Sequence, residues 1–189
     1  MNTNATTGVE PTIVGTSPAM ERLRLDAARL AAGHAKVLIT GESGVGKDLV
    51  ARVIHARSGR ASRPFVAINC AGVAETLLES ELFGHVRGSF TGAHRDKVGL
   101  LQVGHRGTVF LDEVGEMSLR MQALLLRFLE NGEVKPVGSD AVSAKVDVRV
   151  IAATNRHLPD MVARGQSRED LMYRINVVHL QVPPLRDRR

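Results

Sequence analysis

A glycine-rich stretch at residues 41–48 constrains the fold of this chain more than any other feature. Its sequence is Gly41-Glu42-Ser43-Gly44-Val45-Gly46-Lys47-Asp48. The apolar run at residues 36–40 before it predicts a buried strand, and the apolar residues after it recur at helical spacing. A strand thus turns through three glycines into a helix, with a lysine at the turn. This is the G-x-x-x-x-G-K pattern of a phosphate-binding loop, in the context that the pattern requires.

The residue types of this stretch suit an anion. Glycines let successive backbone N–H groups curl around a phosphate, and the helix N-terminus adds the positive end of its dipole. Lys47 supplies a point charge for the outer phosphates. The eighth position departs from the pattern, because a hydroxyl there would ligate magnesium and this chain has Asp48. We expect Asp48 to reach the metal only through water. The alternative, an ordinary glycine-rich turn, is disfavoured by the flanking strand and helix.

Composition narrows the class of protein. A chain of 189 residues with 43% hydrophobic and 24% charged residues is long enough for one soluble domain with a sizeable core. The net charge of +5 permits contact with nucleic acid but does not by itself indicate it. The single cysteine, Cys70, excludes an intramolecular disulfide and fits a reducing cytoplasm. We find neither a signal peptide nor an apolar run of the ~18 residues that a membrane span needs, so we predict a cytoplasmic protein without membrane contact.

Apolar runs and helical patterns alternate along the chain. We predict a disordered lead-in at residues 1–11 and one ordered domain at residues 12–189. Five strands are predicted at residues 36–40, 65–70, 108–113, 146–153 and 176–182. Helices are predicted between them, and residues 84–95 resemble neither a helix nor a core strand. This alternation predicts a three-layer α/β domain with a five-stranded parallel sheet.

Polar residues follow the predicted strands where each one ends. In parallel α/β sheets ligands bind at the carboxyl ends of the strands, so we expect Asn69, Asp112, Glu113 and Asn155 to converge beside Lys47. Asp112 is the natural Mg²⁺ carboxylate, directly or through water. Glu113 can polarise an attacking water, and Asn155 can bond the γ-phosphate or that water, although its position is equally typical of a turn. The set predicts transfer of a phosphoryl group to water.

These residues together resemble a specific family, the AAA+ P-loop NTPase domain of bacterial sigma-54-dependent transcription activators, also called enhancer-binding proteins. The resemblance covers nearly everything from Ile13 to the end of the chain. It is carried by the glycine-rich stretch and by residues 79–85, 88–93, 107–114, 152–156, 168–177 and 183–186.

The resemblance implies roles for individual residues. Residues 41–48 are similar to the Walker A loop, which in this family usually has an acidic eighth residue, most often glutamate. Asp112 and Glu113 resemble the Walker B pair. Asn69 matches an asparagine that holds the catalytic glutamate in check, and Asn155 matches sensor I.

The resemblance also implies assembly into a hexameric ring. Arg168 and Arg174 match the arginine fingers that reach the ATP of the neighbouring subunit. From their spacing alone, these two arginines would indicate only a solvated helix face.

A second loop carries the implied partner contact. Gly88-Ser89-Phe90-Thr91-Gly92-Ala93 resembles the loop that contacts the sigma-54 factor of RNA polymerase, with Ser89 in place of the usual alanine. Glycines around an exposed Phe90 and Thr91 suit a mobile finger with an apolar tip. The alternative is a surface turn with Phe90 buried.

Family members normally continue into a small helical lid and carry DNA-binding and sensing domains, for which this chain has no room.

The implied activity is ATP hydrolysis that remodels the sigma-54 closed complex. One alternative is a lidless nucleotide-binding module with weak turnover that co-assembles with, or inhibits, full-length relatives. Another is a related regulator that does not act through sigma-54. A small-molecule P-loop kinase fits less well, because no acceptor pocket is evident.

Overall fold

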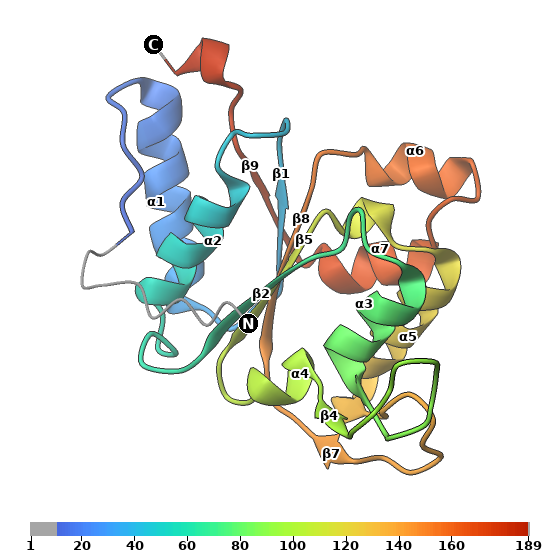
Figure 1. Cartoon of the computed structure of the whole chain (residues 1–189). Helices are drawn as coiled ribbons and strands as arrows, with labels where there is room; N and C mark the ends of the chain where they lie inside the picture. The colour runs from blue at the N-terminus through green and yellow to red at the C-terminus, as the bar shows by residue number, and fades with distance from the viewer. Residues whose placement is uncertain (1–10, 189) are drawn as a thin grey trace.

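The computed structural model describes residues 11–188, and five parallel strands form its central sheet (Figure 1). The strand order is β2-β5-β8-β1-β9. The bounds are β1 Val37–Thr40, β2 Phe65–Asn69, β5 Thr108–Asp112, β8 Arg149–Thr154 and β9 Val178–Gln181. All five predicted strands are present. Strand β8 begins at Arg149 rather than at residue 146, because the backbone N–H of Val146 bonds the carbonyl of Gly132 in a separate hairpin.

Helices cover both faces of this sheet, so the domain has three layers (Figure 1). Two helices, α1 (Pro18–Ala32) and α2 (Lys47–Ala56), pack on one face. The other face carries α3 (Glu75–Phe83), α5 (Leu119–Asn131) and α7 (Glu169–Ile175). Successive strand residues point to opposite faces, so Ile39 lies in the apolar core under α1 and α2 while Leu38 lies in the other core. The predicted α/β class is therefore confirmed.

Short elements lie outside the main sheet. Strand β3 (Gly84–His85) pairs antiparallel with β4 (Lys97–Val98), and β6 (Glu133–Val134) pairs antiparallel with β7 (Ala144–Lys145). The remaining helical turns are α4 (Leu100–Val103), η1 (Val114–Glu116), α6 (Leu158–Ala163) and η2 (Leu185–Asp187). Of residues 84–95, predicted to be neither a helix nor a core strand, the first two form the short strand β3 and the rest lie in the loop between β3 and β4. The predicted lead-in lies, except for Pro11, outside the described residues.

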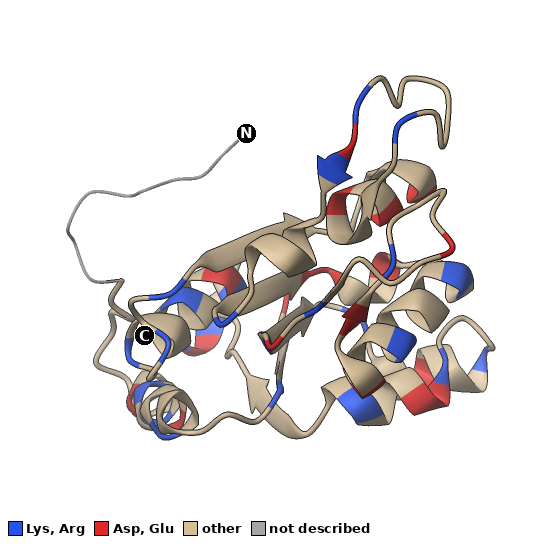
Figure 2. Cartoon of the chain, turned by 90° about the horizontal axis from the view of Figure 1, so that it is seen from below, with Lys and Arg blue, Asp and Glu red and all other residues tan. Residues whose placement is uncertain are grey.

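Charged residues of both signs are mixed over the same helices, rather than separated into one basic and one acidic face (Figure 2). Within residues 11–188 no helix is both long and apolar enough to cross a membrane.

Candidate functional site

A cavity of about 470 Å³ opens at the carboxyl ends of four strands, β1, β2, β5 and β8. Its lining comes from the ends of these strands and the segments that follow them, and consists of Ser43, Gly44, Gly46, Lys47, Asp48, Asn69, Ala71, Asp112, Glu113, Glu116 and Asn155. The polar residues expected to converge from sequence therefore lie around one cavity. Their chemical roles stay predictions.

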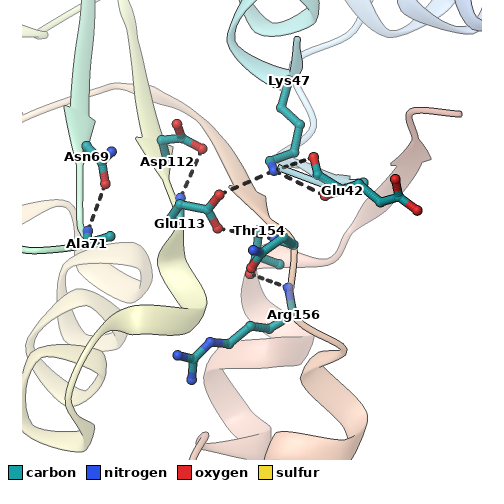
Figure 3. A network of polar contacts seen from close by, with 10 residues as sticks. Glu42, Lys47, Asn69, Ala71, Asp112, Glu113, Thr154 and Arg156 are labelled. Carbon is teal, nitrogen blue, oxygen red and sulfur yellow. Dashed lines mark hydrogen bonds and ion pairs between the residues drawn. The ribbon is translucent and has the colours of Figure 1, made fainter. Parts of the chain in front are cut away.

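The phosphate-binding loop connects β1 to α2, and its glycines adopt backbone conformations with positive φ. Gly46 has φ +87°, a left-handed conformation that other residues rarely adopt, and it is the N-cap of α2. Lys47 is the first residue of α2 and is buried. Its ammonium donates to the carbonyl of Gly41 at 3.1 Å and to that of Glu42 at 3.2 Å (Figure 3). The Lys47 side chain therefore crosses the loop and binds the backbone carbonyls at its start.

The acidic pair stands at the end of β5. Asp112 is the last residue of the strand, and the Glu113 N–H donates to its Oδ1 at 3.0 Å. Glu113 has φ +53°, an uncommon conformation for a residue other than glycine, and such strain is typical of functional positions. Its Oε1 lies 3.3 Å from Lys47 Nζ, and its Oε2 accepts from the Asn155 N–H at 3.2 Å. One carboxylate therefore joins the loops after β1, β5 and β8 (Figure 3).

The role of Asn69 in holding Glu113 in check stays a prediction, and in this structure its side-chain oxygen has another partner. Its Oδ1 accepts from the Ala71 N–H at 2.8 Å, and no hydrogen bond joins it to Glu113 within the described part of the chain (Figure 3). In this structure Lys47 and the Asn155 N–H contact the two oxygens of the Glu113 carboxylate.

The electrostatics of the cavity fit a divalent cation. Burial raises the pKa of Asp112, and the neighbouring Glu113 and Asp48 charges raise it further, against the lowering effects of the Glu113 N–H and Lys47. Carboxylates that repel one another in this way favour a cation between them. Residues 11–188 contain no cluster of three or more His, Cys, Asp or Glu side chains suited to a metal. Mg²⁺ is commonly held in proteins by one or two carboxylates together with substrate phosphates and water, and Asp112 is the carboxylate predicted for it.

The two predicted arginine fingers lie away from this cavity. Arg168 precedes α7, is exposed, and pairs with Asp170 at 2.7 Å. Arg174 is also exposed, and its guanidinium donates weakly to the carbonyl of Leu129 at 3.5 Å. Neither lines the cavity of its own chain, and their role as arginine fingers stays a prediction.

The loop of residues 88–93 differs from the exposed finger that we expected. Phe90 is half-buried, and its ring meets the His85 ring edge-on at 5.0 Å. His85 is itself fixed by Ser80 of α3, whose Oγ lies 2.7 Å from His85 Nδ1. Within this loop Gly88, Thr91 and Gly92 are exposed. Phe90 is therefore docked in this structure, because the His85 ring offers it a buried edge.

Ser89 meets a neighbouring loop. Its hydroxyl is buried and has no hydrogen-bond partner among residues 11–188, and Gly138 packs directly against its side chain. A Cβ at Gly138 would overlap Ser89, and the φ of +79° also favours glycine there. The loop between β6 and β7 thus packs against the 88–93 loop.

An ion pair next to the cavity was missed from sequence. Arg156 Nη2 lies 2.6 Å from Glu116 Oε2, which ties the turn after β5 to the turn after β8. The signal available was only that Arg156 directly follows Asn155. Nothing local indicates its partner.

The comparisons with known proteins agree with this geometry. The family model described as "Sigma-54 interaction domain" matches residues 13–181. The regulatory protein AtoC of Escherichia coli (strain K12) is 54% identical over 177 residues, which cover 94% of this chain and 38% of that protein. The chain therefore spans well under half of this curated relative.

Solved structures show the same fold. NtrX from Brucella abortus is 43% identical in its complexes with ADP (TM-score 0.87, 96% of this chain and 40% of that chain) and with ATP (TM-score 0.85, 95% and 41%). The P-loop NTPase domain of a sigma-54 activator from E. coli superposes with a TM-score of 0.59 at 16% identity, over 91% of this chain and 99% of that chain. At that identity the likeness concerns the fold alone.

Proposed function

This chain belongs to the sigma-54 interaction domain family of transcription regulators, and from that premise we propose that it binds ATP with Mg²⁺, hydrolyses it, and remodels the sigma-54 RNA polymerase closed complex. The observation that carries the proposal is the meeting of Lys47, Asp112 and Glu113 around one cavity. The nucleotide complexes of the similar protein NtrX support the choice of nucleotide.

Binding of the phosphates would begin with a change of partner for Lys47. Its ammonium now contacts two loop carbonyls and Glu113. A β- or γ-phosphate oxygen carries more negative charge than a carbonyl and would take over part of this contact. The loop N–H groups and the α2 N-terminus would hold the other oxygens.

Glu113 would then be free to act on water. When Lys47 turns to the phosphates, Glu113 Oε1 can accept a proton from a water in line with the γ-phosphate. The Asn155 N–H at 3.2 Å keeps the other oxygen in place. Asp112 would hold Mg²⁺, which when bound neutralises charge on the phosphates.

Completion of the site would need a second subunit. Arg168 and Arg174 lie outside the cavity of their own chain and are exposed, so we assign them to the nucleotide of a neighbour in a ring. The guanidinium of an arginine supplied in this way stabilises the charge that develops during phosphoryl transfer. We propose a hexameric ring, as the resemblance implies.

The loop at residues 88–93 would make the contact with sigma-54. Phe90 would leave His85 for the partner, since the half-buried ring is not presented fully to solvent. The exposed Thr91 and Gly92 would meet the partner first.

The test is ATP hydrolysis by the purified chain over a range of protein concentrations. We expect specific activity to rise with concentration and to be lost in Arg168→Ala. An equimolar mixture of Arg168→Ala with Glu113→Gln should recover part of the activity, because one variant keeps the arginine and the other keeps the glutamate. Activity that is independent of concentration and unchanged in Arg168→Ala would overturn the role in trans.

A further inference from the structure

The segment after β9, residues 182–188, makes hydrogen bonds to the phosphate-binding loop. Arg188 Nη2 donates to the carbonyl of Val45, in the middle of that loop, at 2.6 Å. The same guanidinium donates from Nε and Nη2 to the carbonyl of Pro183, at 3.0 and 2.9 Å. One side chain therefore bridges two backbone carbonyls that lie far apart in the sequence.

This contact constrains the direction of a backbone N–H. A trans peptide is planar, so its carbonyl and its N–H point in opposite directions. With the Val45 carbonyl held on Arg188, the Gly46 N–H is turned to the other side of the loop, and Gly46 lines the cavity. Gly46 needs such a restraint because a glycine can rotate more freely than any other residue.

Two further contacts join the same elements. The Val182 N–H donates to the Thr40 carbonyl at 2.8 Å, at the entry to the loop. A Cβ at Gly41 would come within 2.9 Å of the Val182 carbonyl oxygen, so the first glycine of the loop is packed tightly against the end of β9. The segment after β9 therefore touches the loop at its start and at its centre.

A second arginine of this segment, Arg186, forms an ion pair with the loop residue Glu42. Arg186 Nη1 lies 2.8 Å from Glu42 Oε1, and both side chains are largely exposed. Figure 3 shows the Glu42 carboxylate turned away from Lys47, whereas its backbone carbonyl faces Lys47. The pairing keeps a negative charge of the loop away from the place where phosphates would bind.

We propose that Arg188 and Arg186 are positioning residues for the phosphate-binding loop, which fix the Val45–Gly46 peptide and the Glu42 carboxylate so that the loop N–H groups can receive phosphate oxygens. The inference rests on the proposed binding of ATP. It makes the affinity for the triphosphate depend on residues that touch no part of the nucleotide.

Arg188 and Arg186 should contribute to the affinity for ATP to different degrees. A charge-assisted hydrogen bond to a partly buried carbonyl is strong, so we expect Arg188→Ala to weaken ATP binding about tenfold. An exposed ion pair contributes less, so Arg186→Ala should weaken binding only about twofold. Glu42→Gln should restore the affinity lost in Arg186→Ala, because it removes the charge that Arg186 holds.

The experiment measures the dissociation constants of ATP and of inorganic triphosphate for each variant by titration calorimetry, beside the thermal midpoint without ligand. Inorganic triphosphate reports on the phosphate loop alone. Arg164→Ala, which removes an exposed arginine after α6, is the matched control and should leave both constants unchanged. Arg188→Lys should recover only part of the loss, since an ammonium lacks the guanidinium fork that bridges two carbonyls.

Equal loss of affinity for ATP and for inorganic triphosphate in Arg188→Ala, with a thermal midpoint like that of Arg164→Ala, supports the inference. Unchanged affinity in both Arg188→Ala and Arg188→Lys would overturn it while leaving the proposed function intact. Wild-type protein that binds neither ATP nor inorganic triphosphate would overturn the proposed function and this inference with it. A Lys47→Ala protein that binds both ligands as tightly as wild type would do the same.

Discussion

The ammonium of Lys47 lies 3.3 Å from a carboxylate oxygen of Glu113, so the phosphate-binding loop and the acidic end of β5 are joined by an ion pair. Both side chains are largely shielded from water, at 6% and 16% exposure. The pair links the residue proposed to bind phosphate with the residue proposed to activate water. Phosphate binding and water activation therefore depend on the same contact.

Glu113→Gln should separate these two steps. It removes the carboxylate that competes with phosphate for Lys47, so ATP affinity should stay at the wild-type level or rise. Hydrolysis should fall at least about a hundredfold, because the amide is a poor general base. Nucleotide titration together with phosphate-release kinetics checks both. Lys47→Ala is the contrasting control and should lose binding itself. A Glu113→Gln protein that hydrolyses ATP normally would contradict the assignment.

The Arg156–Glu116 ion pair should matter for hydrolysis more than for stability. The two side chains are 44% and 33% exposed, so breaking their contact should change the free energy of unfolding by no more than about 1 kcal/mol. The pair also holds the turn that presents the Asn155 N–H to Glu113, and loosening it should lower turnover several-fold. Denaturant unfolding and steady-state kinetics of Arg156→Ala test this. The double variant Arg156→Glu with Glu116→Arg should regain activity, and failure to do so would argue against the ion pair.

Ser89→Ala should stabilise the domain. The Ser89 hydroxyl is buried without a hydrogen-bond partner, and an unsatisfied group of this kind costs about 1–3 kcal/mol. The alanine keeps the packing against Gly138 and removes that cost, so the thermal midpoint should rise. Thr91→Ala, at the exposed tip of the same loop, is the control and should leave the midpoint unchanged. A lower midpoint for Ser89→Ala would show that the hydroxyl has a partner in solution.

The parts of this structure that sequence could predict are those with a local pattern. The strand before Gly41, the glycines and Lys47 stand within one short stretch, and Asp112 follows an apolar run that ends abruptly. Parallel pairing then brings the strand ends together, which is why the cavity lining was largely anticipated.

The contacts that sequence could not predict depend on how segments fold back on one another, whether those segments are distant or close in the sequence. Arg188 and Val45 are 143 positions apart, and no periodicity connects them. The docking of Phe90 on His85 depends on how a loop folds back, since both rings lie in the same short segment. The Asn69 side chain accepts from the Ala71 N–H, and the position of Asn69 at a strand end does not by itself indicate that partner. Each of these outcomes is decided by packing in three dimensions.

The buried His55 should make stability depend on pH. Burial lowers its pKa below the usual 6.5, and the Arg149 charge lowers it further, although a hydrogen bond with the Arg63 backbone opposes this. Its Nδ1 lies 2.9 Å from Thr108 Oγ1, and its ring lies beside Phe65. The folded state therefore favours the neutral ring, and the unfolded state binds a proton more readily.

The sign of the effect follows from this difference. Where the unfolded chain binds more protons, stability rises with pH, so the contribution of His55 is complete above about pH 6.5 and is lost as the pH falls through the folded-state pKa. The loss amounts to at most about 1.4 kcal/mol per pH unit. Urea unfolding between about pH 7.5 and about pH 5, the range in which histidine titrates, should show a shallower decline of stability for His55→Gln than for wild type. Identical slopes would mean that His55 is protonated as easily in the folded protein as in the unfolded chain.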